Sequence, residues 1–208
     1  RREFFSYPER DKIGTLSASK FPITRTMLKT SAMKIQAFSL SILALLAVAG
    51  CSNDREPNQK LADYVDLDRF MGIWYVHGYT PTAIDKNAWN PTEAYKMRDD
   101  GKIQTIYQFR RGSSYGKVKT YKPVGTIKNT ETNAEWRMRF FGVINATYYV
   151  LYVSDDYQEC IIGHPNKKYA WIMTRSKSID DRSYEDLLQA LKDRDYDLDR
   201  FRRASHEW

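Results

Sequence analysis

The sequence predicts an all-β domain, an eight-stranded up-and-down antiparallel β-barrel with a C-terminal α-helix packed outside it. Short strand-like runs follow one another from Ile73 to Arg175 at the spacing of an all-β domain. Turn-forming residues such as Asp99-Asp100-Gly101 separate these runs. One amphipathic helical segment follows the last run. A meander with this number of strands closes most economically into a barrel.

The expected strands cover residues 73–79, 92–98, 102–110, 116–127, 134–141, 146–154, 158–163 and 168–175. The alternation of apolar and charged residues is clearest in the fifth run. Its apolar face carries Trp136, Met138 and Phe140, and the charged residues between them take the other face. The link from Thr80 to Pro91, which includes Trp89, is too long for a tight hairpin and could cover the barrel mouth.

The sixth run is apolar on both faces. We expect Tyr148, Val150 and Tyr152 to point inward with the fifth strand. The other face carries Tyr149, Leu151 and Val153. Either the helix or a second subunit would cover such an outward stripe, so a homodimer is left open.

The helix is expected at about 178–194. Ser178-Ile179-Asp180-Asp181 has the form of a capping box that begins at the serine. Tyr184, Leu187, Leu188 and Leu191 then recur at helical spacing and form one apolar stripe. Residues 196–208 read as a polar tail of mixed charge.

The N-terminal part indicates a secretory signal over residues 33–50. Met33-Lys34 gives a basic start, residues 37–48 are almost wholly apolar, and small residues precede Cys51. The apolar run is shorter than the ~20 residues that a membrane-spanning helix needs. Since such signals begin at the start methionine, Met33 or Met27, residues 1–32 are interpreted as an upstream extension outside the mature protein.

The small residues followed by Cys51 resemble a bacterial lipobox. That resemblance implies cleavage before Cys51 and acylation of its thiol and new amino terminus, with a plain signal peptide and an incidental cysteine as the alternative. Ser52 stands where an aspartate would retain a lipoprotein in the inner membrane, so the expected location is the outer membrane, facing the periplasm. Residues 51–61 form a lipidated, polar tether to a domain at 62–208.

The charge distribution argues against nucleic-acid binding. Of the net charge of +7, residues 1–51 contribute +5 (eight Lys or Arg against three Asp or Glu) and the remainder +2. Three scattered histidines, His77, His164 and His206, form no zinc motif. Phosphate-binding loops and catalytic serine motifs are also missing, so we expect no metal, no cofactor and no catalytic residue.

Three short motifs stand out, and the first and last of them are expected to close the base of the barrel. They are Gly72-x-Trp74 on the first strand, Asp155-Asp156-Tyr157 in a late turn, and Arg175 at the end of the last strand. If the first and last strands are neighbours, Arg175 could stack over Trp74, an interaction worth ~0.5–2 kcal/mol. The three motifs, in this order, resemble the signature regions of the lipocalin family over about residues 61–202. The resemblance is closest to bacterial outer-membrane lipocalins, which are similar to apolipoprotein D.

This resemblance implies a non-enzymatic, membrane-anchored lipoprotein that stores or transfers fatty acids or lysophospholipids in the bacterial cell envelope. The expected pocket walls are Tyr95, Tyr107, Trp136, Met138, Phe140, Tyr148 and Val150. Two alternatives stay open. One is an enzyme that uses Cys160 as a nucleophile, as in a lipocalin that isomerises prostaglandins. The other is a structural envelope-stress lipoprotein whose own side chains fill the barrel.

Overall fold

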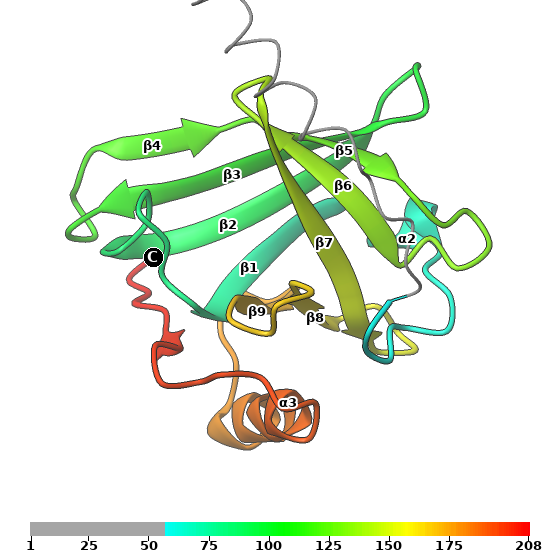
Figure 1. The fold of residues 1–208 in the computed structure, drawn as a ribbon. Helices are drawn as coiled ribbons and strands as arrows, with labels where there is room; N and C mark the ends of the chain where they lie inside the picture. Colours follow the sequence, from blue (N-terminus) through cyan, green and yellow to red (C-terminus); the bar gives the residue numbers. More distant parts are fainter. Residues whose placement is uncertain (1–56) are drawn as a thin grey trace, which may run out of the picture. The chain divides into compact units, whose positions relative to one another are not determined.

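A computed structural model describes residues 57–208, which form a β-barrel with one helix beside it (Figure 1). The predicted extension, signal peptide and lipidated Cys51 lie outside the described residues. The elements are α2 (Leu67–Phe70), β1 (Gly72–Tyr79), β2 (Ala88–Met97), β3 (Ile103–Arg111), β4 (Val118–Tyr121), β5 (Val124–Ile127), β6 (Glu135–Phe140), β7 (Ile144–Val153), β8 (Glu159–Gly163), β9 (Ala170–Thr174), α3 (Asp181–Lys192) and β10 (Arg202–Arg203).

The sheet closes on itself. Its order is β10-β1-β2-β3-β5-β6-β7-β8-β9, and β1 also pairs with β9, with Tyr75 opposite Thr174 and Tyr79 opposite Trp171. Every strand pair in the sheet is antiparallel. The predicted up-and-down barrel of eight strands is therefore confirmed, with β4 and β5 together forming one interrupted strand.

The interruption between β4 and β5 corrects the single strand expected at 116–127. Lys122 and Pro123 separate the two pieces. Proline has no backbone N–H to donate to a ladder, so it breaks pairing inside a sheet. As a result β4 pairs only with β3, whereas β5 pairs with the start of β3 and with β6.

The two ends of the barrel differ in their connections. One end carries α2 and the turns at 98–102, 128–134 and 154–158, and the opposite end carries the connections at 80–87, 112–117, 141–143 and 164–169. Trp89 was placed in the first long connection, but β2 begins at Ala88 and contains it. The shorter link of 80–87 still lies at the barrel mouth, as expected.

The inward and outward faces of β7 change at a β-bulge. The register with β8 shifts between Val150 and Tyr152, because two residues of one strand there oppose one of the other. Tyr152 consequently packs outside with the α3 cluster, and Val153 packs against the barrel core. The strict alternation predicted for these two residues was therefore wrong.

Helix α3 covers the outside of the barrel at β7, β8 and β9 (Figure 1). Tyr184, Leu187 and Leu191 are buried there with Tyr149 and Leu151 of β7. The outward apolar stripe is thus covered largely by the helix, the first of the two predicted alternatives. A homodimer stays a prediction.

The helix begins later than the sequence predicted. Asp180, not Ser178, is the N-cap, and its carboxylate accepts hydrogen bonds from the backbone N–H and hydroxyl of Ser183. Both Ser and Asp suit an N-cap, so the spacing alone did not decide between them.

The C-terminal segment is folded against the barrel and is not a free polar tail. Arg202 and Arg203 pair with Tyr79 and Gly78 of β1. Gly78 makes this possible, because a Cβ there would lie 2.7 Å from the Phe201 ring. Within residues 57–208, no helix is long and apolar enough to cross a membrane.

Candidate ligand-binding site

The closed end of the barrel is held by Arg175 and Trp74. The guanidinium carbon of Arg175 lies 3.8 Å from the centroid of the Trp74 ring, so the predicted stack is present. Its nitrogens donate to the carbonyl oxygens of Arg69, Phe70, Met71 and Ile73 at 2.7–3.0 Å. Gly72, with φ of 99°, lets the guanidinium approach, because a Cβ there would meet Arg175 Nη1 at 3.3 Å.

The Asp156-Tyr157 turn meets α2 at the same end. The Tyr157 hydroxyl accepts from the backbone N–H of Asp66 at 2.7 Å, and Arg69 stacks over the Tyr157 ring at 4.1 Å. Asp156 closes its own turn by accepting from Ser154 Oγ and from the backbone N–H of Gln158, and these bonds lower its pKa. The three motifs singled out in the sequence therefore come together here.

The half of the barrel next to this end is packed with side chains. Phe70 of α2 lies with its ring centroid 5.1 Å from Trp74, 5.4 Å from Tyr95 and 5.5 Å from Trp136. Val150 is fully buried in the same cluster. Three of the predicted wall residues, Tyr95, Trp136 and Val150, thus belong to this packed layer and do not line the cavity above it.

A cavity of about 330 Å³ occupies the other half of the barrel, toward the mouth. Four of the predicted wall residues line it, namely Tyr107, Met138, Phe140 and Tyr148. Pro123, Ile144, Ala146, Tyr169 and Trp171 add further walls, and Thr82 to Asp85 contribute from the 80–87 link. The volume is at the lower end of the range for small-molecule sites, and the walls are chiefly apolar and aromatic.

The rim of this cavity is apolar and exposed. Phe141 and Ile144 line the cavity, yet 67% and 56% of their surfaces face outward at the 141–143 connection. Val143 between them is 78% exposed. An apolar chain could therefore pass from solvent into the cavity over an apolar edge.

Two carboxyl groups stand among the cavity walls. Glu93 of β2 is 7% exposed, and its Oε2 accepts hydrogen bonds from the hydroxyls of Tyr95 and Tyr148. Burial raises the pKa of Glu93, and it raises those of Tyr95 and Tyr148 well above their usual value, so both phenols stay protonated donors. These two tyrosine hydroxyls also contact each other.

The second carboxyl group, Asp85, connects the 80–87 link to the barrel wall. Its Oδ2 accepts from the Tyr107 hydroxyl at 3.0 Å, and its Oδ1 accepts from Thr82 Oγ1 at 2.7 Å. The Tyr79 hydroxyl donates to the backbone carbonyl of Asp85 at 3.1 Å. This network connects the link to the barrel wall, and Arg200 adds a hydrogen bond to the carbonyl oxygen of Pro81 at 2.8 Å.

Sequence reasoning missed Glu93, Asp85, Thr105 and Trp171 as cavity residues. A signal for Glu93 was present, since it shares a strand face with Tyr95, which was expected to point inward. An ionisable residue at an inward position of a strand marks a candidate site. Asp85 lies in an irregular link, where no periodicity indicates which way a side chain points.

Comparisons with known proteins agree with this geometry. A family model described as "Lipocalin-like domain" matches residues 65–206. The chain belongs to the lipocalin-like family. It is 25% identical over 146 residues to temperature-induced lipocalin-1 of Arabidopsis thaliana, covering 67% of this chain and 78% of that protein. It is 24% identical over 174 residues to the outer membrane lipoprotein Blc of Escherichia coli (strain K12), covering 81% and 96%.

The lipocalin fold is also seen in a solved structure, insecticyanin from the tobacco hornworm Manduca sexta. The two structures align with a TM-score of 0.56 at 23% identity, over 74% of this chain and 87% of insecticyanin. Lipocalins bind small hydrophobic ligands, and an apolar cavity inside this lipocalin barrel is consistent with that role.

Cys160 does not have the setting of a catalytic nucleophile. It is fully buried in the barrel core and does not line the cavity. Burial raises its pKa well above the usual value, which disfavours the reactive thiolate. Its side chain serves there as a small core group of this lipocalin barrel.

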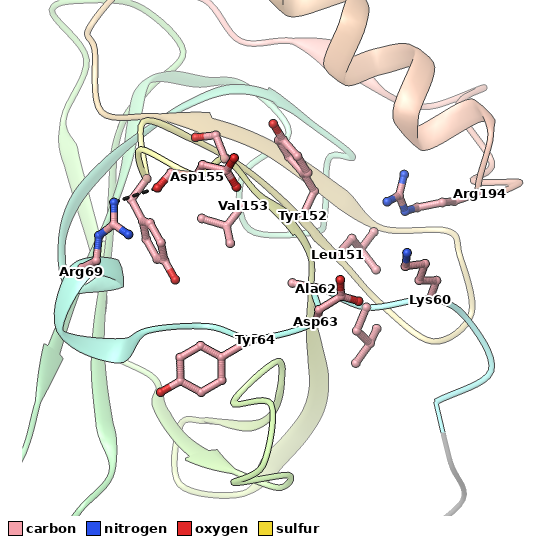
Figure 2. Close-up of a pocket in the computed structure, with 13 residues that line it drawn as sticks. Lys60, Ala62, Asp63, Tyr64, Arg69, Leu151, Tyr152, Val153, Asp155 and Arg194 are labelled. Atoms are coloured by element: carbon pink, nitrogen blue, oxygen red, sulfur yellow. Dashed lines mark hydrogen bonds between the residues drawn. The ribbon is translucent and has the colours of Figure 1, made fainter.

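A second hollow of about 350 Å³ lies outside the barrel near the closed end (Figure 2). Its lining includes the charged residues Lys60, Asp63, Arg69 and Arg194. Figure 2 shows Lys60 and Arg194 at one side of this groove and Arg69 at the other, where Arg69 donates to the backbone oxygen of Asp155. Its walls mix these charged side chains with apolar ones such as Leu61, Leu151 and Val153, unlike the chiefly apolar cavity inside the barrel. Among residues 57–208, no group of His, Cys, Asp or Glu could hold a metal ion.

Proposed function

We propose that this lipocalin binds a single-chain amphiphile, of the fatty-acid or lysophospholipid type, with the apolar chain inside the barrel. The observation that carries the proposal is the apolar cavity of about 330 Å³ with an apolar rim. A charged carboxylate or phosphate would stay at the mouth, in water. The protein would store or transfer such a molecule by shielding its chain.

The free energy for this binding comes from burying the chain. Each methylene transferred from water contributes ~0.8 kcal/mol, so eight buried methylenes contribute roughly 6 kcal/mol before ordering costs. That is adequate for micromolar-range affinity if the ordering cost is modest. The cavity's size limits it to a single chain rather than to the two chains of a bilayer phospholipid.

The proposed place of action is the outer membrane of a bacterial cell, with the barrel facing the periplasm. Two features support it. Cys51 follows a signal-like segment in the sequence, and the similar protein from Escherichia coli is named an outer membrane lipoprotein. Acyl groups on Cys51 would hold the protein on the membrane from which its ligand comes.

The test is displacement of a neutral apolar fluorophore, N-phenyl-1-naphthylamine, from protein lacking residues 1–51. We expect saturable uptake and competition by dodecanol. Ala146 lines the cavity, so Ala146→Trp should fill it and abolish uptake. Asn145→Trp is the matched control, because the neighbouring side chain is exposed on the outer face of β7.

A filled barrel predicts a different result. Uptake that does not saturate, or that persists unchanged in the Ala146→Trp variant, would contradict ligand binding in this cavity. The structural alternative from the sequence analysis would then be favoured.

A further inference from the structure

The cavity wall presents one buried oxygen without a hydrogen-bond partner and one carboxyl oxygen that neither neighbouring tyrosine uses. Both tyrosine hydroxyls at Glu93 donate to the same oxygen, Oε2, and neither donates to Oε1. Thr105 on β3 is 2% exposed, and its Oγ1 is buried without a partner. Glu93 and Thr105 both line the cavity. Unpaired polar groups at a buried position are costly, and a ligand that pairs with them recovers that cost.

The charge of the cavity lining is one-sided. Glu93 and Asp85 contribute two carboxyl groups, and the lining contains no Lys or Arg. His164 also lines the cavity, and burial lowers its pKa, so it supplies little positive charge at neutral pH. An anion placed against this wall would meet a carboxyl group and no compensating cation.

Aromatic faces surround the same region. Tyr148 stacks between Trp136 and Trp171, with ring centroids 5.6 Å and 6.1 Å away. Tyr107 and Trp171 line the cavity together with Tyr148. Aromatic faces attract cations, and the attraction increases when water is excluded.

From this arrangement we propose that the inner wall around Glu93 is a recognition site for the positively charged end of a single-chain amphiphile, an amine or a small alkylammonium. The inference rests on the proposed function and adds the class of head group and its direction of entry. The cation enters first and pairs with Glu93 Oε1, Thr105 Oγ1 accepts from a donor on the ligand, and the alkyl chain extends past Met138 and Phe140 toward the rim. Fatty acids would bind the other way round, chain first, without this contact.

The raised pKa of Glu93 is compatible with this pairing. Burial raises the pKa of Glu93 by disfavouring the ionised carboxyl group. A cation at hydrogen-bond distance favours the ionised form and opposes that effect. If the carboxyl group served only to accept the hydrogen bonds of the Tyr95 and Tyr148 hydroxyls, the cavity would show no preference for the charge of its ligand.

The experiment compares ligands that share a dodecyl chain and differ only at the polar end. Dodecylamine, dodecyltrimethylammonium, dodecanol and dodecanoate each compete with N-phenyl-1-naphthylamine on wild-type protein, below their micelle concentrations. We expect at least one of the two cations to bind about tenfold more tightly than dodecanol, because a hydrogen bond or ion contact with a charged group exceeds a neutral one. Dodecanoate should bind no more tightly than dodecanol.

The variant Glu93→Gln keeps the shape of the side chain and removes its charge. We expect the preference for the cation over dodecanol to fall to within about threefold. Glu131→Gln is the matched control, since Glu131 is exposed in the turn after β5 at the closed end. It should leave the preference unchanged, which separates the cavity site from general attraction to acidic surface.

The outcomes separate this inference from the proposed function. Dodecanol that competes while neither cation binds more tightly than dodecanol overturns the head-group site and leaves the lipid-binding function intact. A preference that survives Glu93→Gln overturns it too. If no dodecyl ligand displaces the fluorophore saturably, the proposed function itself fails. Should Glu93→Gln not fold, the wild-type series alone decides.

Discussion

Arg175 joins three parts of the chain through one planar group. Its guanidinium donates to carbonyl oxygens at the end of α2, at Met71 and near the start of β1, and its face covers Trp74. Arginine suits this position because its guanidinium presents several donors in a fixed plane and stacks on aromatic rings. The closed end therefore depends on the geometry of this group as well as on its charge.

Removing Trp74 should destabilise the barrel strongly. The side chain is fully buried, and its indole N–H donates to Phe70 at 2.9 Å. Trp74→Ala should lower the free energy of unfolding by ~3–5 kcal/mol, as large-to-small core changes do. Denaturant unfolding followed by circular dichroism measures this, and a Trp74→Ala variant of wild-type stability would contradict the placement.

Replacing Arg175 by lysine tests the planar geometry separately. Lysine keeps the charge but cannot donate to four carbonyls and stack at once, so Arg175→Lys should cost about 1–3 kcal/mol of unfolding free energy. Arg182→Lys on the exposed side of α3 is the control and should be nearly neutral. Equal unfolding curves for the two variants would show that charge alone matters at the closed end.

His77 should make the domain less stable in acid. It is 2% exposed, its Nε2 contacts Thr174 Oγ1 and the Ser176 carbonyl, and burial lowers its pKa from 6.5 to about 4. Between these two values the unfolded chain binds more protons than the folded one, so the free energy of unfolding falls as the pH falls. We expect that loss from about pH 6.5 down to about pH 4, with little further contribution below.

The variant His77→Gln isolates this contribution. His206, whose ring packs against His77 at a tilt with centroids 5.0 Å apart, and His164 also have lowered pKa values and keep their share of the acid sensitivity. Denaturant unfolding at pH 7, 5.5 and 4 should therefore give a shallower slope for His77→Gln than for the wild type. Parallel slopes would show that His77 does not titrate differently in the two states.

At the scale of the elements, α3 offers a direct comparison of two candidate caps. Asp180→Ala removes the acceptor for Ser183 and should lower the melting temperature by about 2–4 °C. Ser178→Ala changes the residue that the sequence pattern favoured, and it should have a much smaller effect. Thermal unfolding monitored at 222 nm measures both, and a reversed order would place the helix start at Ser178.

The sequence was sufficient for most strands and for the helix, because periodicity and turn residues act locally. It could not predict what depends on pairing between strands. The bulge near Leu151 is decided by how β7 pairs with β8, and β10 exists only because β1 has a free edge position for it. The inward positions of β6 followed directly from alternation, because β6 pairs regularly along its whole length.

At the scale of the whole molecule, the division of the barrel into a packed half and an open half was not accessible from the sequence. Tyr95, Trp136 and Val150 have the same inward pattern as Tyr107, Met138 and Tyr148, but they lie nearer α2 and Phe70 fills the space between them. Depth along the barrel depends on strand stagger and on this plug from another element. Ligand binding in the open half is the prediction that the fluorophore displacement experiment addresses.

The lipid anchor is the last prediction, and the chain supplies its own control. Cys51 and Cys160 are the two cysteines, and Cys160 is fully buried in the barrel, where no acyltransferase could reach it. When the full chain is expressed in a Gram-negative host with labelled palmitate, wild type and Cys160→Ser should carry label and sediment with the outer membrane. Cys51→Ser should lose the label and be released from the membrane, because stable attachment requires acyl chains and none would remain. Label that persists in Cys51→Ser would exclude this anchor and, with it, the proposed supply of ligand from the membrane to which the barrel is tethered.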